Sequence, residues 1–513
     1  MYCEKGFDIG RNQAEPVVLL PKMANRHGLI CGATGTGKTV TLKVLAESLS
    51  DAGVPVFMTD VKGDLAGLCR PGVDSEAVRS RVAKYGLAET GFHFDSYPVR
   101  FWDVFGEGGI PLRTTVSEMG PVLLSKLLGL NATQTDILTL VFRIADEEKL
   151  LLIDSKDLRS MLRHVSENSA AYSETYGNIP KASVNAILRG VVALEARGGE
   201  QFFGEPALNL TDWFETKNGK GIIHILDSRK LMNDSSLYTA FLLWMLSELY
   251  ETLPEVGDPD KPRMVLFFDE AHLIFTGLSK PLREKLEQVV RLIRSKGVGV
   301  FFITQNPGDI PSGILGQLGN KILHGLRMNT TAEERAVGVT LRSFPKNPAL
   351  DYKTALAGLG TGEALVSMLD ETGAPTMAKV CGILPPQSLL GPIPEEERKR
   401  MVDSDNLYLR YRDMTDRDSA YEFLERKRQV DALEAEKQAL EAEKSKADAK
   451  RKSAQEKEVR RSVRRVGSTV AGTVGREIGN TVGKSVGGSF GKRLGGNLGA
   501  ALGRSILGTF LKG

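Results

Sequence analysis

A glycine-rich segment near the start of the chain restricts the fold class. It follows the pattern G-x-x-x-x-G-K-S/T, and its residues are Gly32, Ala33, Thr34, Gly35, Thr36, Gly37, Lys38 and Thr39. The apolar run 27–31 precedes it, and residues 40–49, which follow it, have the apolar spacing of a helix. A second apolar run, 54–60, comes next. Strand, glycine loop, helix and strand form a βαβ unit, which predicts an α/β fold with a parallel sheet buried on both faces.

Further strands and one core helix are expected later in the chain. The strand candidates are residues 221–226, 264–269, 298–304, 321–326 and 363–368. Several of them are apolar throughout, as the central strands of a parallel sheet are. Residues 235–253 are long enough for a helix and apolar nearly all round, so we place this helix in the core. The α/β pattern therefore extends far beyond the glycine loop.

The glycine-rich segment also has the residue types of a phosphate-binding loop. Glycine lets the backbone curl closely, so that its N–H groups point at a phosphate. Lys38 can reach the β- and γ-phosphate oxygens of a nucleotide, and the Thr39 hydroxyl can bind Mg²⁺. The helix that follows, from about Val40, adds the partial positive charge of its N-terminus. The segment predicts a site for ATP and Mg²⁺.

Polar residues after three other apolar runs complete the predicted site. Asp269 and Glu270 follow one run, where Asp269 would hold Mg²⁺ through water and Glu270 would polarise the attacking water. Gln305 follows the run 298–304 and is suited to sensing the γ-phosphate. Asp60 ends the run 54–60, and it lies either at the ligand edge of the sheet or in the cap of its own loop.

Changes in apolar periodicity, charge, and glycine and proline content divide the chain into segments. The five expected segments are residues 1–110, 111–205, 206–394, 395–466 and 467–513. The first and third form the α/β core, and the second carries amphipathic helical stretches that indicate a helical insertion. The fourth lacks glycine and proline and is rich in charge, which predicts a long helix. Leu433, Leu440 and Ala447 recur at seven-residue spacing. This spacing is equally compatible with a single solvated helix and with a weak coiled coil.

The last part of the chain differs from the rest in charge and glycine content. Residues 1–397 carry 41 Lys and Arg against 48 Asp and Glu, whereas residues 398–513 carry 26 against 16. Of the 54 glycines, 14 lie in residues 467–513, where glycine recurs at every fourth position from Gly475 to Gly503. The chain is therefore an acidic body followed by a basic tail.

Three interpretations of the glycine-repeat tail are open. A row of glycines on one helix face allows a partner helix to approach closely. A basic segment with interspersed apolar residues can instead adhere to an anionic membrane surface. A flexible tail is the third interpretation, because glycine disfavours helices in water. The basic block at 450–465 beside it could bind nucleic-acid phosphates or form a solvated face.

Composition excludes several classes of protein. Hydrophobic residues make up 41% and charged residues 26%, which is ordinary for a globular chain and excludes disorder throughout. The cysteines at 3, 31, 69 and 381 form no C-x-x-C pair, which argues against a zinc site or a disulfide framework. No apolar leader and no run of 18 apolar residues occur, so the expected location is the cytoplasm, with the tail as a route to peripheral membrane association.

Four stretches together resemble the HerA/FtsK branch of P-loop ATPases. They are RHGLICGATGTGKT, DVKGD, FFDEAH and RLIRSKGVGVFFITQNPGDIP. Two further stretches, LPEVGDPDKPR and LGTGEALVS, are most similar to those of bacterial YjgR-type proteins, which are HerA-like helicase C-terminal domain proteins. The resemblance covers about residues 1–390 and implies a RecA-like P-loop NTPase core. HerA enzymes also carry a β-barrel domain ahead of the ATPase, for which the residues before the glycine loop leave no room.

The resemblance implies a mechanism and partners. It implies an ATP hydrolase that forms a homo-oligomeric ring, commonly a hexamer, and moves a polymer, with double-stranded DNA as the first choice. Arg26 stands at the place of a functional arginine before the P-loop strand. Arg291 and Arg294 both match the arginine that acts on the neighbouring subunit's nucleotide, and the sequence does not choose between them. The alternative function is a nucleotide-switched scaffold or a membrane-associated assembly ATPase that does not move DNA.

Overall fold

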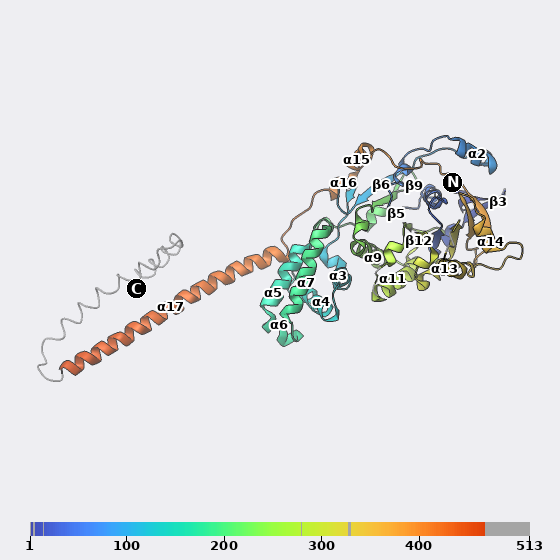
Figure 1. The fold of residues 1–513 in the computed structure, drawn as a ribbon. Coiled ribbons are helices and arrows are strands. Elements are labelled where there is room, and N and C mark those ends of the chain that lie inside the picture. The colour runs from blue at the N-terminus through green and yellow to red at the C-terminus, as the bar shows by residue number, and fades with distance from the viewer. Residues whose placement is uncertain are drawn as a thin grey trace. The chain divides into compact units, whose positions relative to one another are not determined.

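The computed structural model describes residues 2–3, 6–13, 15–276, 278, 280–326 and 330–466. The chain divides between Arg426 and Lys427 into two compact units. The first unit holds the sheet, the helical insertion and the first turns of the long helix α17 (Ala420–Val466) (Figure 1). The predicted glycine-repeat tail, with its proposed membrane or partner-helix contacts, lies outside the described residues. The five-segment division stays a prediction.

A mixed sheet organises the first unit, and most of it is parallel (Figure 1). Its parallel strands are, in spatial order, β13 (Asn320–His324), β4 (Gly28–Cys31), β12 (Val298–Thr304), β11 (Met264–Phe268), β5 (Val56–Asp60), β10 (Ile223–Asp227), β6 (Val99–Asp103) and β7 (Ile110–Pro111). The predicted α/β fold with a parallel-rich sheet is therefore confirmed.

Antiparallel strands extend the sheet beyond β13; the strand expected at 363–368 is one of them, but the sequence predicted neither the other strands nor the antiparallel pairing. In spatial order they are β14 (Glu363–Ser367), β15 (Lys379–Ile383), β2 (Gly6–Asn12) and β1 (Tyr2–Cys3), with β3 (Glu15–Leu19) on β2. The pairing of β2 with β15 joins the two ends of the core sequence, which local periodicity cannot reveal. A separate small hairpin pairs β8 (Thr216–Lys217) with β9 (Lys220–Gly221).

The centre of the sheet is closely packed because its strands carry bulky apolar side chains on both faces. All residues of β11 and β12 are buried, as the continuous apolar runs predicted. Phe301 of β12 lies against Gly28 of β4, where an added Cβ would come within 2.2 Å of the phenyl ring. Gly28 is therefore required at this register, and the P-loop strand is locked beside β12.

Helices flank the strands of the core. They are η1 (Pro21–Arg26), α1 (Lys38–Asp51), η2 (Ala66–Cys69), α2 (Glu76–Lys84), η3 (Leu87–Thr90), η6 (Leu231–Asn233), α9 (Ser235–Thr252), α10 (His272–Phe275), α11 (Lys280–Ile293), η7 (Arg294–Lys296), η8 (Pro307–Asp309), α12 (Ser312–Leu315), α13 (Thr331–Leu341) and α14 (Tyr352–Ala357). Helix α9 is buried around most of its circumference, including Phe241 and Trp244, so the predicted core helix is confirmed.

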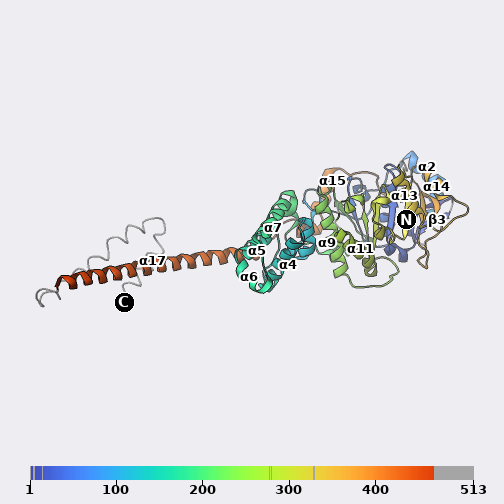
Figure 2. The ribbon, with the colours of Figure 1, turned by 60° about the horizontal axis from the view of Figure 1, so that its bottom comes forward.

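The expected helical insertion is present between β7 and β8, and most of its helices gather in one group (Figure 2). Its helical elements are α3 (Val116–Leu127), α4 (Ala132–Glu147), α5 (Ser155–Glu167), α6 (Ser169–Tyr176), α7 (Lys181–Leu194), η4 (Glu195–Gly199), α8 (Glu200–Phe202) and η5 (Leu210–Phe214). Reciprocal side-chain caps begin α3, α4 and α5, which explains where these helices start.

The predicted long helix begins later than the absence of glycine and proline suggested. Two short helices, α15 (Glu395–Asp403) and α16 (Asn406–Tyr411), come before α17. Tertiary contacts hold this stretch to the core: Arg398 is buried and pairs with Asp227 at 3.0 Å. The backbone N–H of Ser419 then donates to the Glu422 carboxylate, which caps the start of α17.

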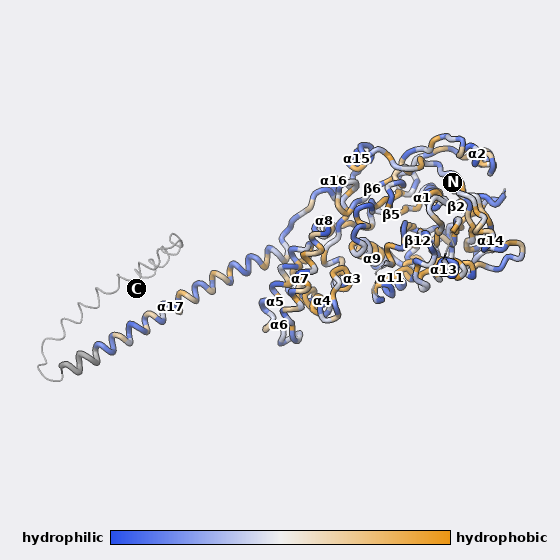
Figure 3. Tube along the Cα trace, viewed as in Figure 1, coloured by the Kyte–Doolittle hydropathy of each residue, from blue (hydrophilic) through white to orange (hydrophobic). Residues whose placement is uncertain are grey.

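Helix α17 is mainly hydrophilic along its described length (Figure 3). Its Val430 and Leu433 side chains are 53% and 60% exposed, so the thin apolar seam is solvated in this single chain. Pairing with a second copy as a coiled coil stays a prediction. Among the residues that the structure describes, no helix combines the length and apolar character needed to cross a membrane.

Candidate nucleotide-binding site

Apart from the arginines, the predicted site residues lie at one edge of the sheet. The glycine loop follows β4, Gln305 follows β12, and Asp269 and Glu270 follow β11. Asp60 is the last residue of β5. These four strands are parallel and adjacent in the order β4, β12, β11, β5, so their carboxyl ends meet at the same edge. The strand order thus brings together residues that the sequence spreads over more than half of the chain.

The glycine loop has the conformation that its glycines allow. Gly35 and Gly37 have φ angles of +80° and +118°, which residues with a Cβ rarely adopt. The Thr36 hydroxyl donates to the Ala33 carbonyl at 2.7 Å and closes the turn. Helix α1 begins directly after Gly37 and has no side-chain cap at its N-terminus. The N–H groups of its first turn therefore face the loop, as an anion site needs.

Lys38 lies folded into the loop that it belongs to. Its Nζ donates to the carbonyl oxygens of Gly32 and Ala33 at 2.6 and 3.1 Å. Burial lowers the pKa of the Lys38 ammonium, an effect that Glu270 opposes and Lys62 reinforces. The ammonium group is held in place by weak neutral acceptors, and phosphate oxygens are stronger partners for it.

A chain of hydrogen bonds connects the loop to the acidic residues. The Thr34 hydroxyl donates to Gln305 Oε1 at 3.2 Å, and Gln305 Nε2 donates to both oxygens of Glu270 at 3.3 Å. Lys62 Nζ donates to Glu270 Oε1 at 2.9 Å. Thr34 and Gln305 are exposed, whereas Glu270 is only 4% exposed and lies beneath them. Gln305 therefore spans the gap between the loop and the acid.

The two acids are adjacent in sequence but differ in electrostatics. Burial, together with the charge of Glu270, raises the pKa of Asp269 to about 6. Burial alone would also raise the pKa of Glu270, but the hydrogen bond and charge of Lys62 bring it below its usual value. The Glu270 backbone has a φ of +47°, a conformation rare for a residue with a long side chain and typical of functional sites. Glu270 thus stays ionised to a lower pH than Asp269 does, as suits a group that polarises water.

The residues predicted to hold Mg²⁺ fit that ion. The Asp269 carboxylate is 7% exposed, and a buried carboxylate with a raised pKa gains most from a divalent cation. Thr39, beside Lys38 in the first turn of α1, supplies a half-buried hydroxyl. Hard oxygen donors of these two types, completed by phosphate and water, are what Mg²⁺ prefers.

Asp60 has the hydrogen bonds of a loop cap, which is the second of its two interpretations. Its carboxylate accepts from the backbone N–H of Gly63 at 2.7 Å and of Leu65 at 3.2 Å. Burial and the neighbouring charge of Asp64 raise the pKa of this carboxyl. Asp60 therefore fixes the turn that carries Lys62, and its predicted contact with nucleotide stays untested.

Two of the predicted arginines meet at the opposite edge of the sheet. Arg26 and Arg294 come before β4 and β12, and the Nη2 atoms of both donate to Asp258 Oδ1 at 3.2 Å. Strand β12 has 7 residues and spans roughly 20 Å, so Arg294 cannot reach the nucleotide edge of its own subunit. Arg291 is exposed on the last turn of α11. The structure thus groups Arg26 with Arg294 and leaves Arg291 apart.

His324 is a site residue that the sequence analysis missed. It ends β13, and its Nε2 lies 2.8 Å from the Thr41 hydroxyl while its Nδ1 lies 3.0 Å from the Glu363 carbonyl. Burial, reinforced by the Lys38 charge, lowers the pKa of His324 to about 4 despite the bond to Glu363, so the ring is neutral. A Cβ at Gly32 would lie 2.5 Å from that of His324. The histidine supports the loop from behind, and a single histidine in an apolar run gave no signal for this role.

Lys62 and Asp258 were also missed as individual residues. Both lie inside stretches that carried the family resemblance, DVKGD and LPEVGDPDKPR. Their partners are far away in sequence, so only the fold shows that Lys62 contacts Glu270 and that Asp258 joins the two arginines. Motif membership was the available signal, but it did not identify the contacts.

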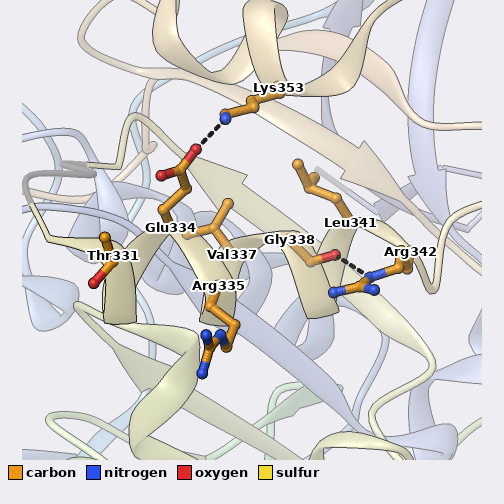
Figure 4. A pocket seen from close by; sticks show the side chains of 8 residues that line it. All are labelled: Thr331, Glu334, Arg335, Val337, Gly338, Leu341, Arg342 and Lys353. Atoms are coloured by element: carbon orange, nitrogen blue, oxygen red, sulfur yellow. Dashed lines mark hydrogen bonds and ion pairs between the residues drawn. The ribbon is translucent and has the colours of Figure 1, made fainter.

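A pocket on α13 and α14 is separate from these residues (Figure 4). It measures about 280 Å³, and Lys353 and Glu334 form an ion pair at its side (Figure 4). Its lining residues are Thr331, Glu334, Arg335, Val337, Gly338, Leu341, Arg342 and Lys353. They include no residue of the P-loop or of the acidic pair.

Comparisons with known proteins identify the family of the chain. Residues 8–513 match the family described as helicase HerA-like C-terminal. No curated protein sequence matches the chain. The structure is similar to the bacterial conjugative coupling protein TrwBdeltaN70, at 16% identity and a TM-score of 0.49, over 77% of this chain and 92% of that one. It is also similar to VirB4 of Thermoanaerobacter pseudethanolicus, at 16% identity and a TM-score of 0.47, over 75% and 97% of the two chains. Because the family match spans nearly the whole sequence, the chain belongs to the helicase HerA-like C-terminal family.

Proposed function

We propose that this P-loop ATPase hydrolyses Mg²⁺-bound ATP as a homo-oligomeric ring, with a hexamer as the expected ring size. The ring uses the reaction to move a polymer, and double-stranded DNA is the expected polymer. One observation carries the proposal. The hydrogen-bonded series Thr34, Gln305 and Glu270 joins the phosphate loop to an ionised acid beside the buried Asp269. This arrangement has the parts that phosphoryl transfer to water needs.

Each residue of the site has a distinct proposed role. Lys38 and the N–H groups of α1 bind the phosphates, and Thr39 and Asp269 hold the metal. Glu270 accepts the proton of the attacking water, and Gln305 orients that water. When bound, Mg²⁺ would neutralise charge on the phosphate oxygens. Structures of TrwB contain ADP with Mg²⁺ or the ATP analogue ADPNP.

The arginine pair supports assembly into a ring. Arg26 and Arg294 lie at the amino edge of the sheet, far from their own subunit's phosphate loop. In a head-to-tail ring, the amino edge of one subunit can face the carboxyl edge of the next. Asp258 then holds both guanidinium groups ready for the neighbour's γ-phosphate, and Arg294 is the arginine that acts in trans.

Mixing two inactive variants tests the trans mechanism. Lys38→Ala and Arg294→Ala are each expected to abolish hydrolysis, while an equimolar mixture recovers activity. Recovery is expected because some interfaces then combine an intact loop with an intact arginine. Arg291→Ala is the matched control, since it removes an exposed arginine from the same region, and it is expected to retain activity. An inactive mixture with confirmed subunit exchange would contradict the proposal, and a monomeric mass with ATP bound would remove it.

DNA stimulation tests the proposed substrate. We expect ATPase activity to rise with double-stranded DNA, and binding to weaken steeply as salt is raised from about 50 to 200 mM. No stimulation and no salt-dependent binding would count against DNA movement and would favour the nucleotide-switched scaffold or membrane-associated assembly ATPase. Flotation with anionic liposomes, with and without residues 467–513, then tests the membrane version.

A further inference from the structure

Lys62 is a second lysine beside the phosphate loop. Its Nζ lies 2.9 Å from Glu270 Oε1, and the same carboxylate accepts from Gln305, which is bonded to Thr34 of the loop. The Lys62 side chain is 43% exposed, whereas the Glu270 side chain is 6% exposed. The cation of this ion pair therefore lies at the open side of the site, and the carboxylate lies at the buried side.

The backbone around Lys62 is fixed before any ligand binds. Asp60 accepts from the N–H groups of Gly63 and Leu65, so it holds both sides of the turn that follows β5. Gly63 has a φ of +79°, which a residue without a Cβ adopts easily. Strand β5 pairs directly with β11, whose end carries Asp269 and Glu270. The buried loop cap thus positions Lys62 across the acidic pair.

Lys62 has binding capacity left after it pairs with Glu270. Among the residues that the structure describes, Glu270 is the acceptor for its ammonium group, which carries three donors. Burial opposes the charge of Lys62, but the bond to Glu270 and the charges of Asp269, Glu270 and Asp64 keep its pKa above the usual value. The Lys62 charge in turn contributes to lowering the pKa of Lys38, and both ammonium groups interact with the Glu270 carboxylate. An anion with several oxygens placed between them would satisfy both.

We propose that Lys62 binds the γ-phosphate of ATP in cis, on the side of the site that Glu270 and Gln305 border, and that it is a determinant of the preference for ATP over ADP. The inference rests on the proposed function and adds a residue to that site. Lys62 stays protonated, forms no covalent bond and shares its donors between the Glu270 carboxylate and the phosphate. The arginines at the opposite edge cannot supply this charge within one subunit. Lys62 therefore provides a second cation, beside Lys38, before the neighbouring subunit contributes one.

Binding of two nucleotides to Lys62→Met tests this inference. We expect the affinity for the ATP analogue ADPNP with Mg²⁺ to fall roughly tenfold, because a charge-assisted hydrogen bond is lost. The affinity for ADP is expected to stay within about twofold of wild type, because the removed contact is to the γ-phosphate. We also expect kcat to fall, and Lys62→Arg to restore most of both properties. Titration calorimetry and steady-state phosphate release measure these quantities on the full chain.

A matched control separates this role from a structural one. Lys353 is also a half-exposed lysine paired with a glutamate, and Lys353→Met is expected to bind both nucleotides as wild type does. Equal losses of ADPNP and ADP affinity in a folded Lys62→Met protein would overturn the inference, as would unchanged or raised turnover. Lys38→Ala keeps the two proposals distinct. If Lys38→Ala still hydrolyses ATP, the proposed function fails, whereas if it is inactive and Lys62→Met behaves as wild type, the Lys62 inference alone fails.

Discussion

Replacing Asp269 by asparagine is expected to stabilise the nucleotide-free protein while it abolishes hydrolysis. The carboxylate is 7% exposed, and burial with the adjacent Glu270 charge raises its pKa to about 6. The ordinary value of an aspartate is about 3.9, so the ionised form is disfavoured in the folded state by about two pKa units, or about 3 kcal/mol. Asparagine keeps the shape and the acceptor for the Glu270 N–H, and it removes the buried charge.

The sign of this effect depends on pH in a defined way. Above about pH 6 the Asp269 carboxyl is ionised in both folded and unfolded states, so the full penalty applies and the variant gains most. Well below about pH 4 the carboxyl is protonated in both states, and the gain disappears. Between these values the difference in the free energy of unfolding between Asp269→Asn and wild type grows as pH rises.

Denaturant unfolding at pH 8 and at pH 4 measures the gain. We expect a clearly higher midpoint for Asp269→Asn at pH 8 with an unchanged slope, and nearly equal midpoints at pH 4. ADPNP with Mg²⁺ should raise the midpoint of wild type and not of the variant. Asp258→Asn is the matched control, because Arg294 and Arg26 lower the pKa of Asp258 and its replacement should not stabilise. A variant that is less stable than wild type at pH 8, or that is stabilised as much at pH 4 as at pH 8, would show that the buried Asp269 charge does not destabilise the folded protein.

Three other substitutions have expected outcomes. Gln305→Ala should lower kcat by about 10²-fold while the KM for ATP changes little, because Gln305 bridges Thr34 and Glu270; steady-state kinetics checks this. Asp258→Asn should slow hydrolysis by the assembled ring without weakening nucleotide binding by the subunit, which calorimetry beside turnover measures. His324→Leu should lower the free energy of unfolding by about 1–3 kcal/mol, because it leaves buried partners such as the Thr41 hydroxyl unsatisfied. Thermal unfolding at constant pH tests this last expectation.

The parts of the fold that could be predicted are those with a strong local pattern. The fully apolar runs became β11 and β12 because a parallel sheet buries both faces of its central strands. The pairing of β2 with β15 had no local signature, since it depends on contacts between the two ends of the core sequence. The sequence also did not predict the break before α17. No proline or glycine marks it, and that stretch is instead held to the core by a buried ion pair between Arg398 and Asp227.

The site shows the same division between local and long-range information. The glycine loop was predictable because its chemistry lies in consecutive residues, and its conformation follows from Gly35 and Gly37. The acidic pair was recognised from its place after an apolar run. The contact of Lys62 with Glu270 bridges 208 positions, so no local pattern predicts it. The position of Asp60 at the end of an apolar run did not reveal its hydrogen bonds either. Only the folded turn shows that Asp60 accepts from the N–H groups of Gly63 and Leu65.

Phosphate release from Mg²⁺-bound ATP by wild type and by Lys38→Ala tests whether the glycine loop is part of an ATP-hydrolysing site. The two proteins should be compared at equal concentration, with matched oligomeric mass and matched thermal unfolding. Because Lys38 is the lysine that lies inside the glycine loop, we expect hydrolysis by wild type and a loss of at least about 10²-fold in the variant. Wild-type turnover by a properly folded Lys38→Ala protein would contradict the assignment of this edge of the sheet as the site of ATP hydrolysis.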